Sequence, residues 1–474
     1  MSPKTAAKPR SIFRKIWDAH LIEQLDDGRD LIFVDRHVLQ ETTSARAFDG
    51  LRQRGIPVRH PELTIATQDH ILSTEPGRTE ATNPGGRELL ALMRENAFSQ
   101  KVRHFGIGDA RQGIVHVIGP ELGFALPGTI IACGDSHTST AGGLGAFGIG
   151  VGTSEVEHIL ATQTLAMTRP KAMRIRFEGK PARGISAKDL ILRTIGQLGI
   201  SAGQGHAVEY AGPAISALAL EARLTICNMS IELGARLGLV APDEATFAYV
   251  AGREYAPRGA DLERAIAHWR TLPTEAGADF DRDEVVQCGD IAPQITWGTT
   301  QEEVIGVDAR LPDPDGFDDA GRRGRAAKAL AYMGLEPGMS IEGLPIDVAF
   351  IGSCTNARLS DLEDAAAVVR GRQVAPHVRA LVVPGSMSVK RAAEERGLDR
   401  VFRDAGFEWR DAGCSMCVSI NDDIVAPGQR CLATSNRNFE NRQGPGSRTH
   451  LASPATVAAG AIAGRITDVR KVPS

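Results

Sequence analysis

The sequence predicts an α/β protein in which buried parallel strands alternate with amphipathic helices. Two observations support this prediction. Several short runs are rich in β-branched residues and almost continuously apolar, which is typical of strands covered on both faces. These runs lead into polar, glycine-rich loops and then into helical patterns, the order that produces α/β layers. The 474 residues are enough for about three domains of ordinary size.

The individual elements can be placed along the chain. Strands are expected at 31–34, 63–66, 129–133, 346–351, 378–383 and 430–434. Helices are expected at 155–168, 187–198 and 361–370. Residues 308–325 are rich in Asp, Gly, Pro and Arg, which is typical of an exposed linker. This linker would separate a long N-terminal part from a C-terminal α/β unit of about 150 residues.

The composition argues against several classes of function. The formal net charge is −4 and the chain has no basic tract of note, so neither nucleic acid nor an anionic membrane is an expected partner. No window approaches the roughly 18 apolar residues that a membrane helix needs. The seven cysteines are an odd, sparse set, which argues against a disulfide framework and makes a reducing cytoplasm the expected location.

Three of the cysteines suggest a metal centre. Cys414 and Cys417 lie three residues apart in Gly-Cys-Ser-Met-Cys, so both sulfurs can bind one centre from a single loop. Cys354, in Gly-Ser-Cys-Thr-Asn, can supply a third sulfur. Three thiolates leave a tetrahedral or cubane site one ligand short, and an open position is typical of catalytic sites. A zinc site and a pair of buried or redox-active cysteines remain alternatives at this point.

Other polar motifs stand at the carboxyl ends of predicted strands, where open α/β sheets gather their catalytic groups. Asp69-His70, Asp135-Ser136-His137 and Asn436-Arg437 each follow such a strand. A histidine paired with a carboxylate suits proton transfer to a leaving hydroxyl, although each Asp or Ser alone could simply cap a helix. The arginines suit bidentate binding of carboxylates, with a solvated surface pair as the alternative.

The glycines at 143–148 spell the pattern of a dinucleotide-binding loop, but we reject that interpretation. Such a loop begins directly at the end of its strand, whereas here the Asp-Ser-His loop intervenes. We expect these glycines to let backbone segments pack closely behind the site instead.

Six strings in the chain resemble the aconitase superfamily: residues 133–140, 153–158, 227–232, 352–356, 413–417 and 435–439. The resemblance extends from about Phe13 to Gly464. It implies an aconitase-like α/β fold, with three α/β/α domains packed around one [4Fe–4S] cluster. The domains would span approximately residues 1–205, 206–315 and 316–474.

The resemblance also implies roles for particular residues. The cluster ligands would be Cys354, Cys414 and Cys417, which leave one iron without a protein ligand. The histidine–carboxylate pairs would be His70 with Asp69, His116 with Asp135, and His137 with Glu232. The substrate-contacting positions would be Gln40, Ser136, Arg437 and Arg442, and the residues beside the cluster would be Asn228 and Asn436.

The chain departs from the typical pattern at three places: Ala141–Gly143, residues 418–422 and Asn441. A glycine is usual at the last of these, and asparagine is the best substitute for glycine at a positive φ. These departures leave the expected chemistry intact but leave the identity of the substrate open.

The resemblance implies a hydro-lyase that moves a hydroxyl between adjacent carbons of a branched 2-hydroxy diacid. Single-chain members carry a fourth, swivelling domain, so a separate small subunit is the expected partner. Methylmalate, dimethylmalate and homoaconitate are alternative substrates. A cluster-sensing RNA-binding protein and a zinc-bound structural protein are rivals from other classes. The first is disfavoured by the charge of −4, and the second is separated by metal and sulfide analysis.

Overall fold

The computed structural model describes residues 8–473. Its first sheet is parallel throughout and supplies the N-terminal half of the site. Its strands, in the spatial order β5-β4-β3-β6-β7, are β5 (Arg103–Phe105), β4 (Thr64–Thr67), β3 (Arg36–Gln40), β6 (Ile130–Cys133) and β7 (Phe147–Gly150). The predicted strands at 63–66 and 129–133 are therefore confirmed within one residue.

The C-terminal sheet is also entirely parallel and has the same kind of topology. Its spatial order is β17 (Glu408–Trp409), β16 (Arg379–Val382), β15 (Val348–Ile351), β18 (Arg430–Ala433) and β19 (Arg448–Leu451). The three strands predicted for this part of the chain are confirmed. In both sheets the first strand along the chain lies in the middle, with its successors added on either side.

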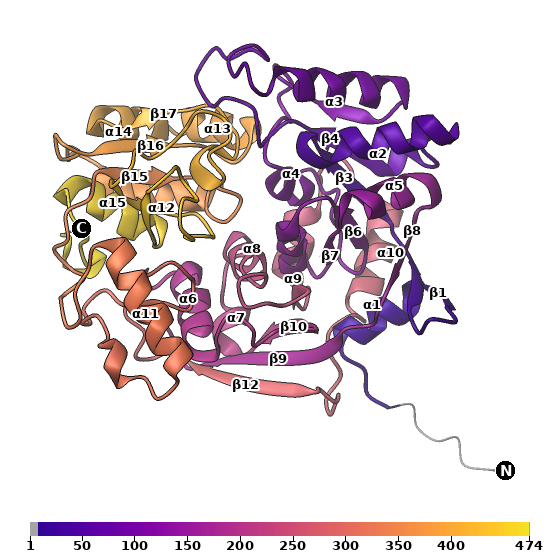
Figure 1. The fold of residues 1–474 in the computed structure, drawn as a ribbon. Helices are drawn as coiled ribbons and strands as arrows, with labels where there is room; N and C mark the ends of the chain where they lie inside the picture. The colour runs from indigo at the N-terminus through magenta and orange to yellow at the C-terminus, as the bar shows by residue number, and fades with distance from the viewer. Residues whose placement is uncertain (1–7, 474) are drawn as a thin grey trace.

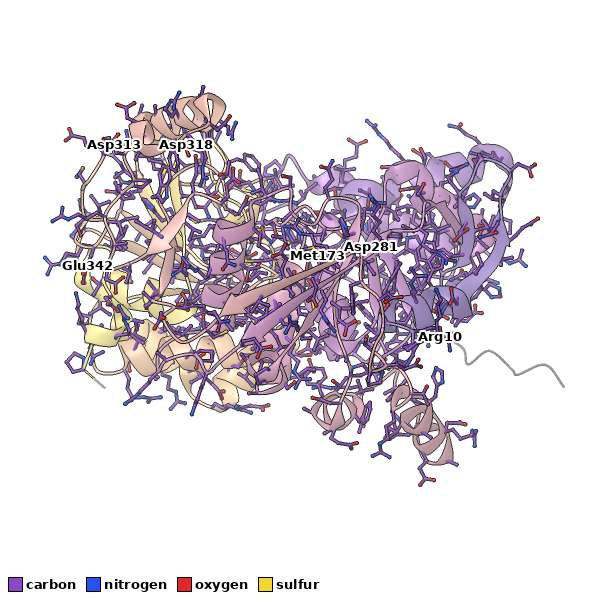
Figure 2. All side chains as sticks on the ribbon, turned by 90° about the horizontal axis from the view of Figure 1, so that it is seen from below. Arg10, Met173, Asp281, Asp313, Asp318 and Glu342 are labelled. Carbon is purple, nitrogen blue, oxygen red and sulfur yellow. The ribbon has the colours of Figure 1, made fainter. Side chains whose placement is uncertain are left out.

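A third parallel sheet lies below the other two in Figure 1 and was not predicted. It contains β11 (Leu237–Val240), β10 (His206–Ala211), β9 (Lys171–Glu178) and β12 (Arg282–Gln287), in that order. Figure 2 views the molecule from the side of this sheet, with Met173 labelled on β9 and Asp281 just before β12. Because β9 precedes residue 206, this sheet crosses the expected boundary between residues 1–205 and 206–315.

Two predicted elements differ from the structure. The strand expected at 31–34 exists as β2 (Asp30–Phe33), but it pairs antiparallel with β1 (Leu21–Gln24) and β8 (Thr164–Met167). The helix expected at 155–168 ends early as α5 (Thr153–Thr162), because Gln163 adopts a left-handed conformation with φ of 62°. The chain then enters β8. In this strand buried and partly exposed side chains alternate, which is the period of a strand and not of the helix expected here from the sequence.

Helices cover the faces of the sheets. Those of the N-terminal half are α1 (Ile12–His20), α2 (Glu41–Arg54), α3 (Arg87–Ser99), α4 (Val115–Glu121) and α6 (Ala187–Leu198). The central part contains α7 (Pro213–Ser216), α8 (Leu220–Asn228), α9 (Glu244–Val250) and α10 (Ala260–Trp269). The C-terminal part contains α11 (Ala320–Met333), α12 (Leu359–Val369), α13 (Met387–Glu395), α14 (Leu398–Ala405) and α15 (Pro454–Ala463). No helix among the described residues is long and apolar enough to span a membrane.

The helices expected at 187–198 and 361–370 are confirmed as α6 and, with shifted ends, α12. The stretch 308–325 is mostly exposed, as expected of a linker, and Figure 2 shows Asp313 and Asp318 at the outer edge of the molecule. Its last residues, however, form the first turn of α11, where the Asp319 side chain accepts a hydrogen bond from the Arg322 amide and caps the helix.

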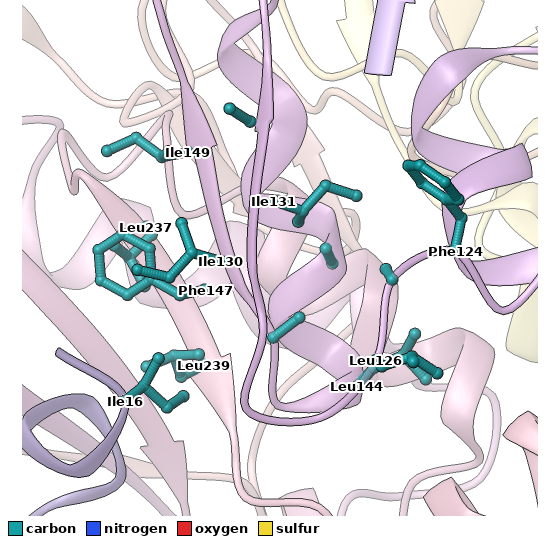
Figure 3. Close-up of a cluster of buried hydrophobic side chains, with 14 of the residues drawn as sticks. Ile16, Phe124, Leu126, Ile130, Ile131, Leu144, Phe147, Ile149, Leu237 and Leu239 are labelled. Atoms are coloured by element: carbon teal, nitrogen blue, oxygen red, sulfur yellow. The ribbon is translucent and has the colours of Figure 1, made fainter. Parts of the chain in front are cut away.

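One hydrophobic core joins the first sheet to the third. Figure 3 shows Ile130 of β6 and Phe147 of β7 packed with Leu237 and Leu239 of β11, while Ile16 of α1 closes the cluster. All these side chains are almost fully buried. The two sheets therefore hold each other in place through apolar packing, which gives the loops at their ends fixed positions.

The glycines that follow the Asp-Ser-His loop permit a close approach of backbone segments, as expected. A Cβ on Gly142 would lie 1.7 Å from the carbonyl oxygen of Gly238 in β11, and one on Gly143 would lie 2.7 Å from the Leu224 amide in α8. Any larger residue would push η2 (Ser136–Leu144), the 3-10 helix that carries His137, away from these neighbours.

The buried histidines predict a pH dependence of stability. His37 on β3 is fully buried, and its ring nitrogens have no hydrogen-bond partner within residues 8–473. Burial lowers the pKa of His37 to about 3, so the folded protein keeps the ring neutral while the unfolded chain protonates it below about pH 6.5. Its contribution to stability is therefore present at neutral pH and is lost as the pH falls from about 6.5 toward 3.

We expect His37 to remove about 1 kcal/mol of stability as the pH falls from about 7.5 to about 5.5, while the raised pKa values of His70 and His137 act in the opposite direction. Over this range the melting temperature of His37→Leu should therefore rise relative to that of the wild type, measured anaerobically by scanning calorimetry at each pH. His158→Leu is the control, because this side chain is exposed in the folded protein. An unchanged pH slope in His37→Leu would contradict the assignment.

Candidate active site

The site lies where the carboxyl ends of the N-terminal and C-terminal parallel sheets meet. In each sheet the chain adds two strands on one side of the central strand and then crosses to the other side, so the strand order reverses between β3 and β6 in one sheet and between β15 and β18 in the other. Such switch points leave a crevice outside the strand ends. The loops after β4, β6, β15 and β18 therefore converge, which confirms that the polar motifs share one place.

These loops enclose a cavity of about 170 Å³. It is lined by His70, Ile114, His116, Asp135, His137, Cys354, Cys414, Cys417, Val418, Arg437 and Arg442. Apart from Ile114 and Val418, every lining side chain carries a titratable group or a permanent charge. The cavity is thus built to hold an anionic, oxygen-rich molecule beside three sulfur atoms.

His70 is held between two carboxylates. Its Nδ1 lies 2.6 Å from Oδ1 of Asp69, and its Nε2 lies 3.2 Å from Oδ2 of Asp135. Burial alone would lower the pKa of His70, but the two carboxylates raise it well above the usual value. The imidazole is therefore stabilised as a cation at neutral pH, the state that can donate a proton.

Asp135 connects all three histidines of the cavity. Its Oδ1 lies 2.7 Å from Nε2 of His116 and accepts a hydrogen bond from the backbone amide of His137. Burial would raise the pKa of Asp135, but the surrounding histidines hold it well below its usual range. This shared carboxylate fixes the rings relative to one another.

His137 pairs with Glu232, which enters from the loop after α8. The distance from Nε2 of His137 to Oε1 of Glu232 is 3.0 Å, and Glu232 also accepts a hydrogen bond from Nε of Arg437 at 2.9 Å. Burial opposes both charges, yet the pairing raises the pKa of His137 to about 9 and lowers that of Glu232. The three expected histidine–carboxylate pairs therefore all exist as contacts.

The two arginines have different surroundings. Arg437 donates to Glu232 and, from its terminal nitrogen, to Oγ of Ser136 at 3.2 Å. Nε of Arg442 is buried and has no partner within the part of the chain that the structure describes, while its guanidinium lies 5.1 Å from the centre of the Phe439 ring. An unsatisfied guanidinium in the wall of this cavity is available for a carboxylate of a bound molecule.

The three cysteines line the same cavity although Cys354 is far from the other two in sequence. All three are buried and unpaired. Burial and the negative charge of the Cys417 sulfur raise the pKa of Cys354 to about 12, and burial together with the charges of Asp69 and of the other two sulfur atoms raises the pKa of Cys414 well above its usual value. Each group gains from binding a cationic centre, which would displace the proton and hold the sulfur as a thiolate.

Polar side chains surround the sulfur atoms. Asn228 donates from Nδ2 to Sγ of Cys354 at 3.2 Å, and Asn436 donates to the same sulfur at 3.5 Å. Ser353 donates from Oγ to Sγ of Cys417 at 3.3 Å. Hydrogen bonds to sulfur are the contacts that tune metal–thiolate centres. The residues present therefore fit an iron–sulfur cluster.

A second set of donors overlaps the first. One ligand atom each from Asp69, His70 and Cys414 lies within 4.8 Å of the other two. This mixed set of oxygen, nitrogen and sulfur ligands is also suitable for zinc. Analysis of the bound metal and of sulfide therefore distinguishes a zinc site from an iron–sulfur cluster.

Gln40 is not among the lining residues. Its buried side chain caps α2 by accepting from the Thr42 amide and donates from Nε2 to the carbonyl of Gly134, directly before Asp135. Sequence reasoning missed its neighbour Glu41, which is fully buried and accepts from the amides of Asp69, His70 and Ile71. An acidic residue directly after a buried strand was the signal that could have identified it.

Asp423 was also missed. Its carboxylate is buried and accepts hydrogen bonds from Thr74 at 2.6 Å and from Ser415 at 2.7 Å, and it pairs with Arg410. Ser415 lies between the two cysteines of the Cys-x-x-Cys loop and has a φ of 49°. Asp423 thus ties this loop to the segment that follows His70, and no local sequence pattern predicts such a contact.

Comparison with known proteins assigns the fold and site to a family. The family model described as "Aconitase family (aconitate hydratase)" matches residues 14–464, so this chain belongs to the aconitase family. Among individual relatives, the protein named 3-isopropylmalate dehydratase large subunit 1 from Bradyrhizobium diazoefficiens is 56% identical over 461 residues, which cover 97% of this chain and 96% of that protein. The family and this relative imply a [4Fe–4S] cluster. The relative's name also implies a separate small subunit.

Proposed function

We propose that this chain acts as the large subunit of a 3-isopropylmalate dehydratase, which interconverts 2-isopropylmalate and 3-isopropylmalate by dehydration and rehydration in leucine biosynthesis. The observation that carries the proposal is the 56% identity to such a subunit over nearly the whole of both chains. The cavity agrees with it, since it combines proton donors, a free guanidinium and three thiols. The sparse, unpaired cysteines support a cytoplasmic location.

Cys354, Cys414 and Cys417 are the proposed ligands of the cluster, with one iron left without a protein ligand. When bound, such a cluster supplies Lewis acidity for breaking the carbon–oxygen bond. Asn228, Asn436 and Ser353 hydrogen-bond the sulfur atoms and orient them.

His70 is the proposed general acid. It is held by Asp69 at one ring nitrogen and by Asp135 at the other, both of which keep it protonated, and it lines the cavity. The proton passes from the imidazolium to the leaving hydroxyl, and the carboxylates stabilise the charge before transfer. His116 and His137, fixed by Asp135 and Glu232, complete the hydrogen-bonded wall.

Arg437 and Arg442 are the proposed binding groups for the substrate carboxylates, with Ser136 beside them. Every carboxylate of the cavity is already paired with a histidine or arginine within the described residues. The base that removes the carbon-bound proton is therefore proposed to come from the small subunit, which would carry the swivelling domain.

The apolar branch of the substrate has little surface in this chain, because only Ile114 and Val418 are apolar in the cavity wall. We propose that the small subunit supplies the rest of the branch pocket.

The three domains are proposed to divide near residues 170 and 315 rather than at 205 and 315, since each domain then contains one complete parallel sheet.

The test is reconstitution with the small subunit. The chain purified anaerobically with its cluster should show no dehydratase activity alone and should gain it when the cognate small subunit is added. Spectrophotometric assays with isopropylmalate, methylmalate, dimethylmalate and homoaconitate should give the highest kcat/KM for isopropylmalate. Full turnover by the isolated chain would refute the need for a partner, and a preference for another diacid would move the proposal to that substrate.

A further inference from the structure

Lys188 has an environment that its own helix does not explain. It is the second residue of α6, directly after the first-turn Ala187, and its side chain is 0% exposed. A cation in the first turn of a helix is opposed by the helix dipole, and burial of an ammonium group adds a desolvation cost. Within residues 8–473 its Nζ hydrogen-bonds only carbonyl oxygens, and Glu232 and Asp361 act on it as charges without forming an ion pair. A compensating interaction must therefore lie elsewhere.

That interaction is with the loop that follows β18. Nζ of Lys188 donates to the carbonyl oxygen of Thr434 at 2.8 Å and to that of Ser435 at 2.5 Å. Thr434 is fixed from the other side, because its Oγ1 accepts from the Gly352 amide and donates to the Gly352 carbonyl, two residues before Cys354. The ammonium group thus holds two successive carbonyls of a loop that is anchored to the cysteine segment.

The next two residues of this loop are Asn436 and Arg437, which face the cavity and its sulfur atoms. Asn436 contacts Sγ of Cys354 and Sγ of Cys417, and Arg437 contacts Glu232 and Ser136. Since their side chains start from the backbone that Lys188 holds, a shift of this backbone moves both at once. An error of about 1 Å in such groups is enough to reduce catalysis strongly.

We propose that Lys188 is a positioning residue that reaches from α6 to the loop after β18 and sets the places of Asn436 and Arg437. The expected change in KM and kcat/KM rests on the proposed function. The placement of Asn436 and Arg437 by Lys188 does not. It predicts that loss of the ammonium group changes substrate binding and the electronic surroundings of the cluster, and not stability alone.

The experiment compares Lys188→Met, Lys188→Gln and Lys188→Arg in the reconstituted holoenzyme. Lys188→Met keeps most of the length of the side chain but removes both hydrogen bonds, so KM should rise by about 10-fold or more and kcat/KM should fall at least as far. The EPR spectrum of the reduced cluster should also shift, because Asn436 contacts its ligands. Lys188→Arg, which can donate to both carbonyls, should recover part of both properties.

Arg430→Met is the matched control. Arg430 is a buried cation at the amino end of β18, four residues before Thr434, and it donates to the carbonyl of Met333 rather than to the loop. Its loss should lower the melting temperature while KM and the EPR spectrum stay as in the wild type.

The outcomes separate the two proposals. If Lys188→Met lowers only the melting temperature, as the control does, the positioning role is wrong. If Lys188→Met does not fold, Lys188→Gln decides by the same readouts, because its shorter, neutral side chain still carries a hydrogen-bond donor. If the wild type does not turn over isopropylmalate, the proposed function fails, while the EPR comparison still tests the role of Lys188.

Discussion

Replacing Cys417 by serine is expected to abolish both the cluster and the dehydratase activity. Cys417 lines the cavity with Cys354 and Cys414, and a serine hydroxyl is a far poorer ligand for iron than a thiolate. Anaerobically prepared wild-type protein should contain iron and acid-labile sulfide in near-equal amounts, and Cys417→Ser should lack both. Chemical analysis of iron, zinc and sulfide measures this directly, before any assay of activity.

Cys431→Ser is the matched control for this substitution. Cys431 is an equally buried free thiol on β18, but it packs among apolar side chains of the sheet and is not part of the cavity wall. Its variant should keep the cluster at some cost in stability. The cluster assignment would be refuted by stoichiometric zinc without sulfide in the wild type, or by an intact cluster in Cys417→Ser.

Replacing His70 by asparagine is expected to lower kcat by roughly 10²-fold or more, the range for a lost general acid. The amide keeps hydrogen-bonding capacity but cannot deliver a proton. Because Asp69 also approaches Cys414, the variant must first be shown to keep its iron and sulfide. The kinetic comparison, on reconstituted enzyme at saturating substrate, then reports on turnover and not on loss of the cluster.

A second histidine–carboxylate pair, His20 with Asp35, serves as the control for this substitution. His20 lies 2.7 Å from Asp35, and the carboxylate raises its pKa against the effect of burial, as in the site. His20 lies at the end of α1, outside the cavity, so His20→Asn should leave kcat unchanged. A near-normal kcat in His70→Asn with the cluster intact would remove His70 from the role of acid.

The backbone conformation of Asn441 could be predicted from the sequence. It stands where the family usually has glycine, and we expected it to tolerate a positive φ. The structure gives it a φ of 66°, with its Oδ1 accepting from the Gly446 amide. Such a turn depends on one residue and its near neighbours, which is why the sequence alone was sufficient.

Local patterns in the sequence were sufficient to place five strands of the two sheets that form the site, the motifs at their ends and the family. Apolar runs bounded by polar loops are local patterns, and the carboxyl end of a parallel strand is a general place for functional groups. The pairing of His70 with Asp69 could be read from adjacent residues for the same reason.

Contacts between groups far apart in sequence could be identified only from the folded chain. The sharing of Asp135 among three histidines, the support of the His70 loop by Glu41 and the reach of Lys188 to Thr434 and Ser435 all join residues far apart in sequence. The sheet built from β9 to β12 also escaped the sequence pattern, because its strands are paired across long intervals of chain. These contacts are set by how whole sheets pack, and packing depends on every side chain in the core rather than on any local run of residues.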